Sequence, residues 1–229
     1  MIYNKIKPWL PNNIGYLYSL LLLSGFAIAL ILFRVIETRS SRYEFLLWNL
    51  FLAWLPLIFA WALFRRTPKG LNWSWLNFIL FALWLLFLPN AFYLVSDYIH
   101  LGETGEIGLM YDLVLIGTYA WCGFVLGYTS LYLIHKRTIQ RFGQKAHWLP
   151  IACLMLSGFA IYLGRYLRWN SWDIITNPFG ILFDVSNSII NPINHSLTFS
   201  ATLLFFSFLA AIYFVLWQGA KILTTTTKE

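Results

Sequence analysis

Two clusters of polar residues interrupt an otherwise strongly apolar chain, and both carry side chains capable of chemistry. The first cluster consists of Asn90, Tyr93, Asp97, His100 and Asp112. If a helix continues past Pro89, residues three or four apart share one of its faces. Tyr93, Asp97 and His100 have those spacings, so Asp97 or His100 could act as a general base. The alternative is a solvated helix end with ordinary polar residues.

The same cluster offers two ligands to a metal, which is too few for a closed site. His195 is the only other histidine expected on the same side of the membrane. We therefore predict no metal site, with a zinc ion as the alternative, and the sequence identifies no cofactor.

The second cluster lies in the motif GRYLRWNSWD, residues 164–173. A crossing of about twenty residues that starts at Trp148 reaches Leu167, which puts Arg165 about one turn inside the membrane boundary. An arginine at the bilayer centre costs roughly 2.5–3.5 kcal/mol, less near the edge, and such residues pair with a partner. We predict that the partner is Asp97 or Asp112, since both belong to the same side of the membrane.

Arg165 and Arg168 are three residues apart, and two guanidinium groups can also hold a phosphate, such as a lipid headgroup. Asn170 and Asp173 complete the candidate ligand-binding residues of this motif. The alternative is that Arg168, together with the two tryptophans of the motif, anchors the chain at the membrane interface.

Six long apolar stretches predict the elements that position these residues. About twenty apolar residues in a helix rise the ~30 Å of a hydrocarbon core. We predict spans at residues 14–33, 45–64, 74–95, 110–135, 148–168 and 196–217. Charged residues make up only 11% of the chain, against about a quarter in soluble proteins. The predicted fold is an all-α membrane protein, a bundle of about six transmembrane helices whose third helix is broken at Pro89.

Basic residues predict the orientation of this bundle. The terminal tails and the second and fourth connectors carry 11 of the 16 Lys and Arg residues. The positive-inside rule then places both termini in the cytoplasm. The predicted organisation is a cytoplasmic tail over residues 1–13, a six-span domain over 14–217 and a second cytoplasmic tail over 218–229.

The connector between the last two spans, residues 174–195, is long and apolar. It is too short and too interrupted to cross the membrane twice. Two structures are open: a re-entrant segment that covers the polar clusters as a lid, or a segment lying on the membrane surface. In either case we expect its apolar residues to dip into the interface, namely Phe179, Ile181, Leu182, Phe183 and Ile189.

The composition argues against two classes of function, nucleic-acid binding and thiol redox chemistry. The net charge of +7 resides in the connectors and tails, where it sets topology, so the expected partners are membrane lipids and not nucleic acid. Two further partners are consistent with the sequence, a second copy of this chain in a homo-oligomer and another membrane protein. Cys122 and Cys153 fall inside predicted spans and form no disulfide framework.

Several of these residues resemble a known family of small bacterial integral membrane proteins of unknown function. The likeness covers roughly residues 45 to 215. The motifs that carry it are Trp48-Asn49, Ala53-Trp54-Leu55-Pro56, Leu88-Pro89-Asn90-Ala91 with Tyr93, Asp97 and His100, Tyr111-Asp112, and Leu163-Gly164-Arg165 followed by Arg168-Trp169-Asn170-Ser171-Trp172-Asp173. The resemblance implies a multi-pass protein of the bacterial cell (inner) membrane and supplies no reaction.

Three functions are consistent with the sequence. The first is an outward-facing Asp/His/Arg site that binds an anionic headgroup, a small solute or an ion. The second is a membrane-embedded enzyme acting on a lipid-linked substrate, with His100 or Asp97 as the general base. The third is a non-catalytic membrane subunit or assembly factor.

Overall fold

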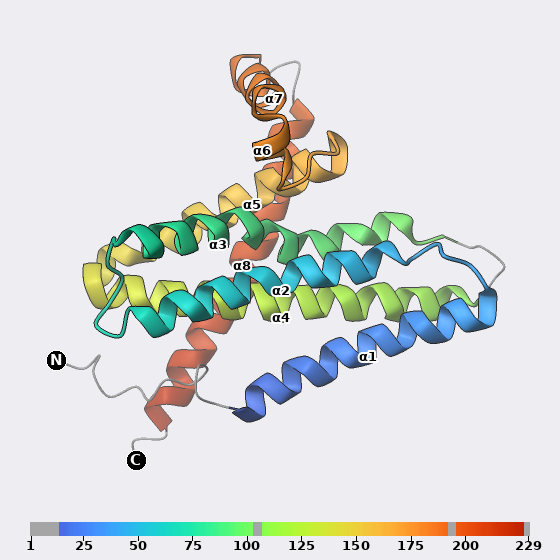
Figure 1. The fold of residues 1–229 in the computed structure, drawn as a ribbon, viewed down its shortest axis with the longest axis horizontal. Coiled ribbons are helices and arrows are strands. Elements are labelled where there is room, and N and C mark those ends of the chain that lie inside the picture. The colour runs from blue at the N-terminus through green and yellow to red at the C-terminus, as the bar shows by residue number, and fades with distance from the viewer. Residues whose placement is uncertain (1–13, 103–106, 192–195, 227–229) are drawn as a thin grey trace. The chain divides into compact units, whose positions relative to one another are not determined.

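The computed structural model describes residues 14–102, 107–191 and 196–226, and all regular structure in these ranges is helical (Figure 1). Two of the helices, η2 and η3, are 3₁₀ helices, and the others are α-helices. In chain order they are α1 (Ile14–Thr38), α2 (Phe45–Arg66), α3 (Trp75–Tyr93), η2 (Leu94–His100), α4 (Leu109–Phe142), η3 (Gly143–His147), α5 (Trp148–Tyr166), α6 (Asp173–Thr176), α7 (Pro178–Ile190) and α8 (Ser196–Thr226).

Five segments of the described chain are long and apolar enough to cross a membrane. They are Ile14–Thr38, Phe45–Arg66, Trp75–His100, Leu109–Tyr166 and Ser196–Ile222. The fourth of these segments contains both α4 and α5. The prediction of an all-helical protein with several membrane-spanning helices is therefore confirmed.

The chain forms two compact units, Met1–His147 and Trp148–Glu229. The first unit contains α1 to η3 and the second contains α5 to α8. The first polar cluster of the sequence belongs to the first unit and the GRYLRWNSWD motif to the second. Each unit is therefore described by itself.

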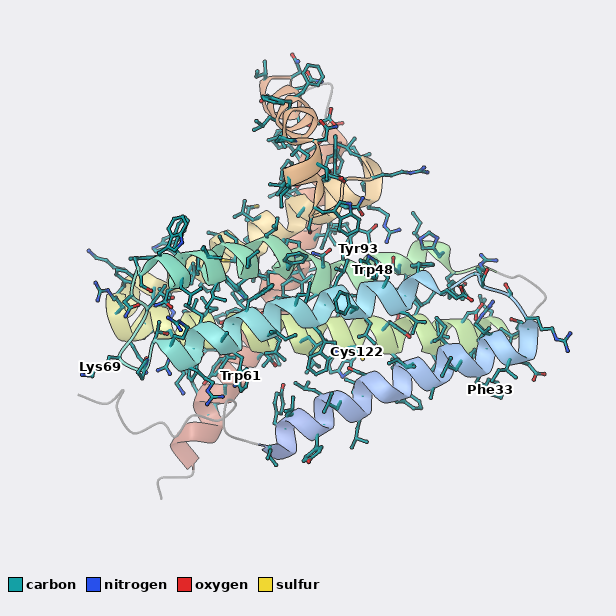
Figure 2. All side chains as sticks on the ribbon, in the orientation of Figure 1. Phe33, Trp48, Trp61, Lys69, Tyr93 and Cys122 are labelled. Carbon is teal, nitrogen blue, oxygen red and sulfur yellow. The ribbon has the colours of Figure 1, made fainter. Side chains whose placement is uncertain are left out.

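Consecutive long helices of the first unit run antiparallel (Figure 1). α1 pairs with α4 in reverse order, because Tyr16 Oη lies 2.8 Å from Thr129 Oγ1 while Tyr111 Oη donates to the Leu30 carbonyl at 2.6 Å. The end of α1, the start of α2, η2 and the start of α4 consequently meet at one end of the unit. We call it the Asp112 end. The labelled side chains Phe33, Trp48, Tyr93 and Cys122 belong to this unit (Figure 2).

Two glycines bring the backbones of α3 and α4 into contact. A Cβ placed on Gly123 would overlap the carbonyl oxygen of Ala91, and one on Gly127 would lie 2.8 Å from the ring of Phe92. Small residues four apart allow this close approach in membranes, where apolar side chains alone give helices little reason to associate. The Trp84 indole adds a bond between the same helices, donating to Ser130 Oγ at 3.2 Å.

The opposite end of the first unit is closed by Arg137 of α4. Its guanidinium donates to the Phe64 carbonyl at 2.9 and 3.2 Å and to the Pro68 carbonyl at 3.0 Å. It also lies 3.5 Å over the Phe64 ring. These bonds satisfy a terminal carbonyl of α2 that has no partner within its own helix, and they explain why α4 continues beyond the predicted limit of residue 135.

The predicted break at Pro89 is wrong, because α3 continues through Pro89 to Tyr93. A proline removes one N–H and therefore one bond of the helical ladder, and the remaining ladder is sufficient here. Asn90 adds a bond beside it, with Nδ2 donating to the Phe87 carbonyl at 3.2 Å. The α-helix becomes the 3₁₀ helix η2 at Leu94, five residues after Pro89.

The second unit is built on the pair α5 and α8. A Cβ on Gly158 would lie 2.7 Å from the Thr202 carbonyl oxygen and 2.9 Å from the Phe206 nitrogen, so these two backbones also touch. The predicted connector at 174–195 contains the short helix α6 and the three-turn helix α7. Residues 192–195 and the side chain of Ile189 lie outside the described part of the chain.

Candidate functional site

A buried ion pair holds the Asp112 end together. Arg34 Nε donates to Asp112 Oδ1 at 2.7 Å and Nη2 donates to Oδ2 at 3.2 Å, which is a bidentate geometry. Both residues are completely buried, with exposed fractions of 0%. Asp112 therefore pairs with an arginine of its own unit that the sequence analysis assigned to a connector. The pair neutralises two charges that would be costly beside hydrocarbon.

Tyr43 connects this ion pair to η2. The Arg34 guanidinium lies 4.5 Å from the centre of the Tyr43 ring, and Tyr43 Oη donates to the His100 carbonyl at 3.0 Å. Arg42 Nη2 donates to the same carbonyl at 3.1 Å. Burial, and secondly the negative charge of Asp112, raises the pKa of Tyr43, so the phenol keeps its proton and remains a donor.

Asp97 and His100 both lie on η2. The sequence predicted that these two residues share one face of a helix. A 3₁₀ helix has three residues per turn, so residues three apart lie directly above one another. Asp97 is buried, with 1% exposed, and accepts a hydrogen bond from Asn49 Nδ2 at 3.0 Å. The His100 side chain is exposed, and its ring lies 5.0 Å from the Phe45 ring. One turn therefore carries a buried carboxylate and an accessible imidazole.

The other two residues of the first cluster lie on α3. Asn90 and Tyr93 are half-buried, and Tyr93 precedes the first residue of η2. Four residues of an ideal 3₁₀ helix turn the chain about 120° past a full turn, so the alignment of Tyr93 with Asp97 stays a prediction. Asp97 and His100, three apart within η2, lie on one face.

A shallow groove of about 470 Å³ opens between α1 and α2 near the same end. Its lining is apolar except for one carboxylate. The residues that line it are Ile31, Leu32, Val35, Glu44, Leu47 and Trp48. A surface of this kind suits hydrocarbon better than a polar solute.

In the second unit, the two arginines of the motif end α5 in different environments. Arg165 is half-buried in the last turn of α5, and Arg168 is exposed just past the end of the helix. Arg168 has φ +62°, in the left-handed region where glycine is usual at a helix end. A non-glycine residue pays about 1–2 kcal/mol for that conformation. The Trp169 N–H donates to the Leu163 carbonyl at 3.2 Å and fixes the turn.

The rest of the motif folds into a compact corner. Asp173 Oδ2 accepts the Asn170 backbone N–H at 2.7 Å and Asn170 Nδ2 at 3.2 Å. The backbone bond lowers the pKa of Asp173, so the carboxylate stays ionised at neutral pH. Trp169 Nε1 donates to Asp184 Oδ2 on α7 at 2.8 Å. Asn170 and Asp173 thus hold the backbone that presents Arg168.

No three His, Cys, Asp or Glu side chains group as metal ligands within residues 14–102, 107–191 and 196–226. Cys122 and Cys153 are both buried free thiols. Asp97 and His100 are of the residue types that transfer protons, and exposed guanidinium groups are of the type that binds anions.

Several contributors to these clusters were not predicted as site residues, among them Arg34, Tyr43 and Asn49. Arg34 carried a usable signal, because Val35 and Ile36 continue the apolar stretch beyond it and so place the charge inside the first span. Asn49 belongs to the Trp48-Asn49 motif that the resemblance pointed out. Tyr43 had no signal, since nothing in its neighbourhood separates it from any other tyrosine near a membrane boundary.

Several apolar helices with buried polar contacts define a polytopic helical membrane protein. Residues 48–216 match a family whose description is "protein of unknown function (DUF1361)". The chain belongs to this family. Comparison with curated proteins gave no match, and neither did comparison with solved structures.

Proposed function

We propose that this protein binds an anionic group, the phosphate of a lipid headgroup or of a small solute, through the arginines that end α5. The observation that carries the proposal is the conformation of Arg168. Strained backbone of this kind is typical of ligand sites, and here it presents an exposed guanidinium one turn after Arg165, from a corner held by the bonds between Asn170 and Asp173. Arg165, Asn170 and Asp173 support it by fixing the turn or adding charge.

The proposal includes the topology. Six spans, both termini in the cytoplasm and a location in a bacterial inner membrane would put the end of α5 on the outer side. The distribution of Lys and Arg supports this orientation. The expected partners are membrane lipids.

Replacing Arg168 with glycine separates a structural role from a binding role. The variant should be as stable as the wild type or more stable, because the left-handed strain of about 1–2 kcal/mol disappears. Binding should weaken on the order of 10- to 100-fold, the loss of one charge-assisted contact. Isothermal titration calorimetry in detergent measures binding of short-chain phosphatidylglycerol and of inorganic phosphate, and these two probes distinguish a headgroup from a free anion.

Arg39→Gly is the matched control for this experiment. Arg39 is exposed, follows α1 and has φ +52°, so the change removes the same charge and the same strain. It should be equally stabilising and leave binding unchanged. An equal loss of binding in both variants would show that only the net charge of the protein matters. Unchanged binding in Arg168→Gly would contradict the proposal.

A second candidate function, an enzyme acting on a lipid-linked substrate, is favoured by η2. A buried carboxylate, Asp97, lies one 3₁₀ turn from an accessible imidazole, His100. That arrangement suits a general base whose proton is taken up or released at the membrane surface.

His100→Gln tests the enzyme without disturbing the core, because the bonds from Tyr43 and Arg42 go to the backbone carbonyl of residue 100. General acid–base catalysis contributes typically 10²–10⁴-fold, so turnover should fall by about that factor. Radiolabelled phospholipid in proteoliposomes, separated by thin-layer chromatography, provides the readout. Turnover equal to the wild type excludes His100, and absence of any turnover by the wild type leaves binding as the function.

A further inference from the structure

Residues 172–190, which contain α6 and α7 and which we call the α6–α7 hairpin, are apolar on their outer side. Phe179 is 83% exposed, Leu182 59% and Phe183 70%. Leu182 and Phe183 follow Phe179 by three and four residues, so the three side chains form one stripe along α7. The exposed large apolar residues of this hairpin are Trp172, Ile174, Ile175, Phe179, Leu182, Phe183 and Ile190. Soluble surfaces rarely keep such a contiguous apolar patch, so it has an occupant.

Asp184 and Ser188 of α7 are turned the other way, whereas Ser186 is exposed on the side of the apolar stripe. Asp184 is bound by the Trp169 indole, and Ser188 is buried with 2% exposed. Gly180 allows the contact, since a Cβ there would lie 2.7 Å from the Trp169 ring. Asn177 caps the start of α7 by accepting the Gly180 N–H at 3.1 Å. These bonds fix the hairpin on its polar side and leave the apolar stripe facing outward.

The position of the hairpin in the chain limits what the occupant is. α5 and α8 lie in segments that are apolar enough to cross a membrane, and Gly158 packs against Thr202 and Phe206. Gly158 lies eight residues before the end of α5, and its contacts lie six and ten residues after the start of α8. These similar lengths bring the end of α5 and the start of α8, and with them both ends of the hairpin, to the same end of the helix pair. An apolar stripe tethered twice at the end of two spans is within reach of the bilayer surface.

The charge of this region indicates how it would bind. Residues 169–220 contain no Lys or Arg, whereas Asp173 and Asp184 are acidic. Interfacial helices that depend on anionic lipid carry Lys and Arg on their polar face. Attachment of α7 itself would therefore depend on apolar burial, whatever headgroup Arg165 and Arg168 bind at the end of α5.

We infer that α7 lies in the membrane interface with Phe179, Leu182 and Phe183 among the acyl chains, and that its occupant is lipid of any headgroup charge. The inference does not depend on anion binding by Arg168. It assigns to α6–α7 the role of a surface anchor in place of a lid.

Nitroxide labels test this inference in the full-length protein. Cys122 and Cys153 are first replaced by alanine, and single cysteines are placed at Phe179, Phe183 and, as the control, exposed Asn170. After reconstitution in phosphatidylcholine vesicles, labels at 179 and 183 should collide more with oxygen than with a water-soluble nickel chelate. The label at 170 should show the reverse ratio.

Added phosphatidylglycerol should leave both ratios unchanged. Labels at 179 and 183 that are accessible to the nickel chelate would overturn the inference, because the stripe would then face water. Labels immobilised and shielded from both reagents would also overturn it, because protein would then cover the stripe. Insertion that requires phosphatidylglycerol would overturn the charge-independent mode of attachment.

Discussion

Asp112→Ala is expected to destabilise the protein by about 3–5 kcal/mol, because it leaves the Arg34 guanidinium buried without its carboxylate. The two residues make a bidentate pair and both have exposed fractions of 0%. Unfolding by SDS in mixed micelles, followed by tryptophan fluorescence, measures the change. Glu37→Ala is the matched control, since it removes an exposed carboxylate from α1 and should shift the midpoint little.

The double variant Arg34→Met with Asp112→Leu extends this test. Replacing a whole buried pair by apolar residues of similar volume is often neutral or stabilising. The double variant should therefore recover most of the stability that either single change loses. If Asp112→Ala unfolds at the same SDS concentration as Glu37→Ala, the pair contributes nothing to stability.

Gly123→Ala is expected to cost at least about 1–3 kcal/mol, the usual penalty for forcing an extra carbon into a packed interior. The added Cβ would meet the backbone carbonyl of Ala91, which cannot move aside as a side chain can. Gly25→Ala is the control, because a Cβ at residue 25 of α1 meets nothing within 4 Å. That change should be neutral or slightly stabilising, since alanine is the better helix former.

The same SDS titration applied to both glycine variants gives the readout. Loss in Gly123→Ala together with no loss in Gly25→Ala supports a backbone contact between α3 and α4. Equal midpoints would mean that the helices separate at low cost and that the two glycines do not hold them together.

The elements of the fold could be predicted from the sequence because hydrocarbon thickness sets a length that apolar runs must match. The ends of the helices could not be predicted in the same way. α1 extends to Thr38, beyond the predicted limit at Phe33, because Asp112 neutralises Arg34 and makes the charge compatible with burial. α4 likewise extends to Phe142, beyond its predicted limit at residue 135, because Arg137 donates hydrogen bonds to the Phe64 carbonyl at the end of α2.

The pairings among the candidate site residues could not be predicted from the sequence. Spacing along one helix can be read from sequence, and the relation of Asp97 to His100 follows from it. The pairing of Arg34 with Asp112 joins residues 78 positions apart, and several carboxylates and arginines competed for it. The helix break expected at Pro89 does not occur, because the surrounding hydrogen bonds of the helix tolerate one missing donor. The change to a 3₁₀ helix at Leu94 has no proline beside it that would have predicted it.

The glycines of α4 were predictable and were overlooked. Gly123 and Gly127 are four apart inside an apolar stretch, the spacing at which two membrane helices approach most closely. The conformation of Arg168 was not predictable, since the sequence around it differs little from an ordinary helix end carrying an arginine.

The separation of Arg34 from Asp112 also has a consequence for biosynthesis. A ribosome adds 77 residues after Arg34 before it adds Asp112. Throughout that interval the newly made first helix carries a cation whose counter-ion does not yet exist, and the headgroup layer is its cheapest location. α1 can therefore settle to its final depth only after the ribosome has passed the start of α4.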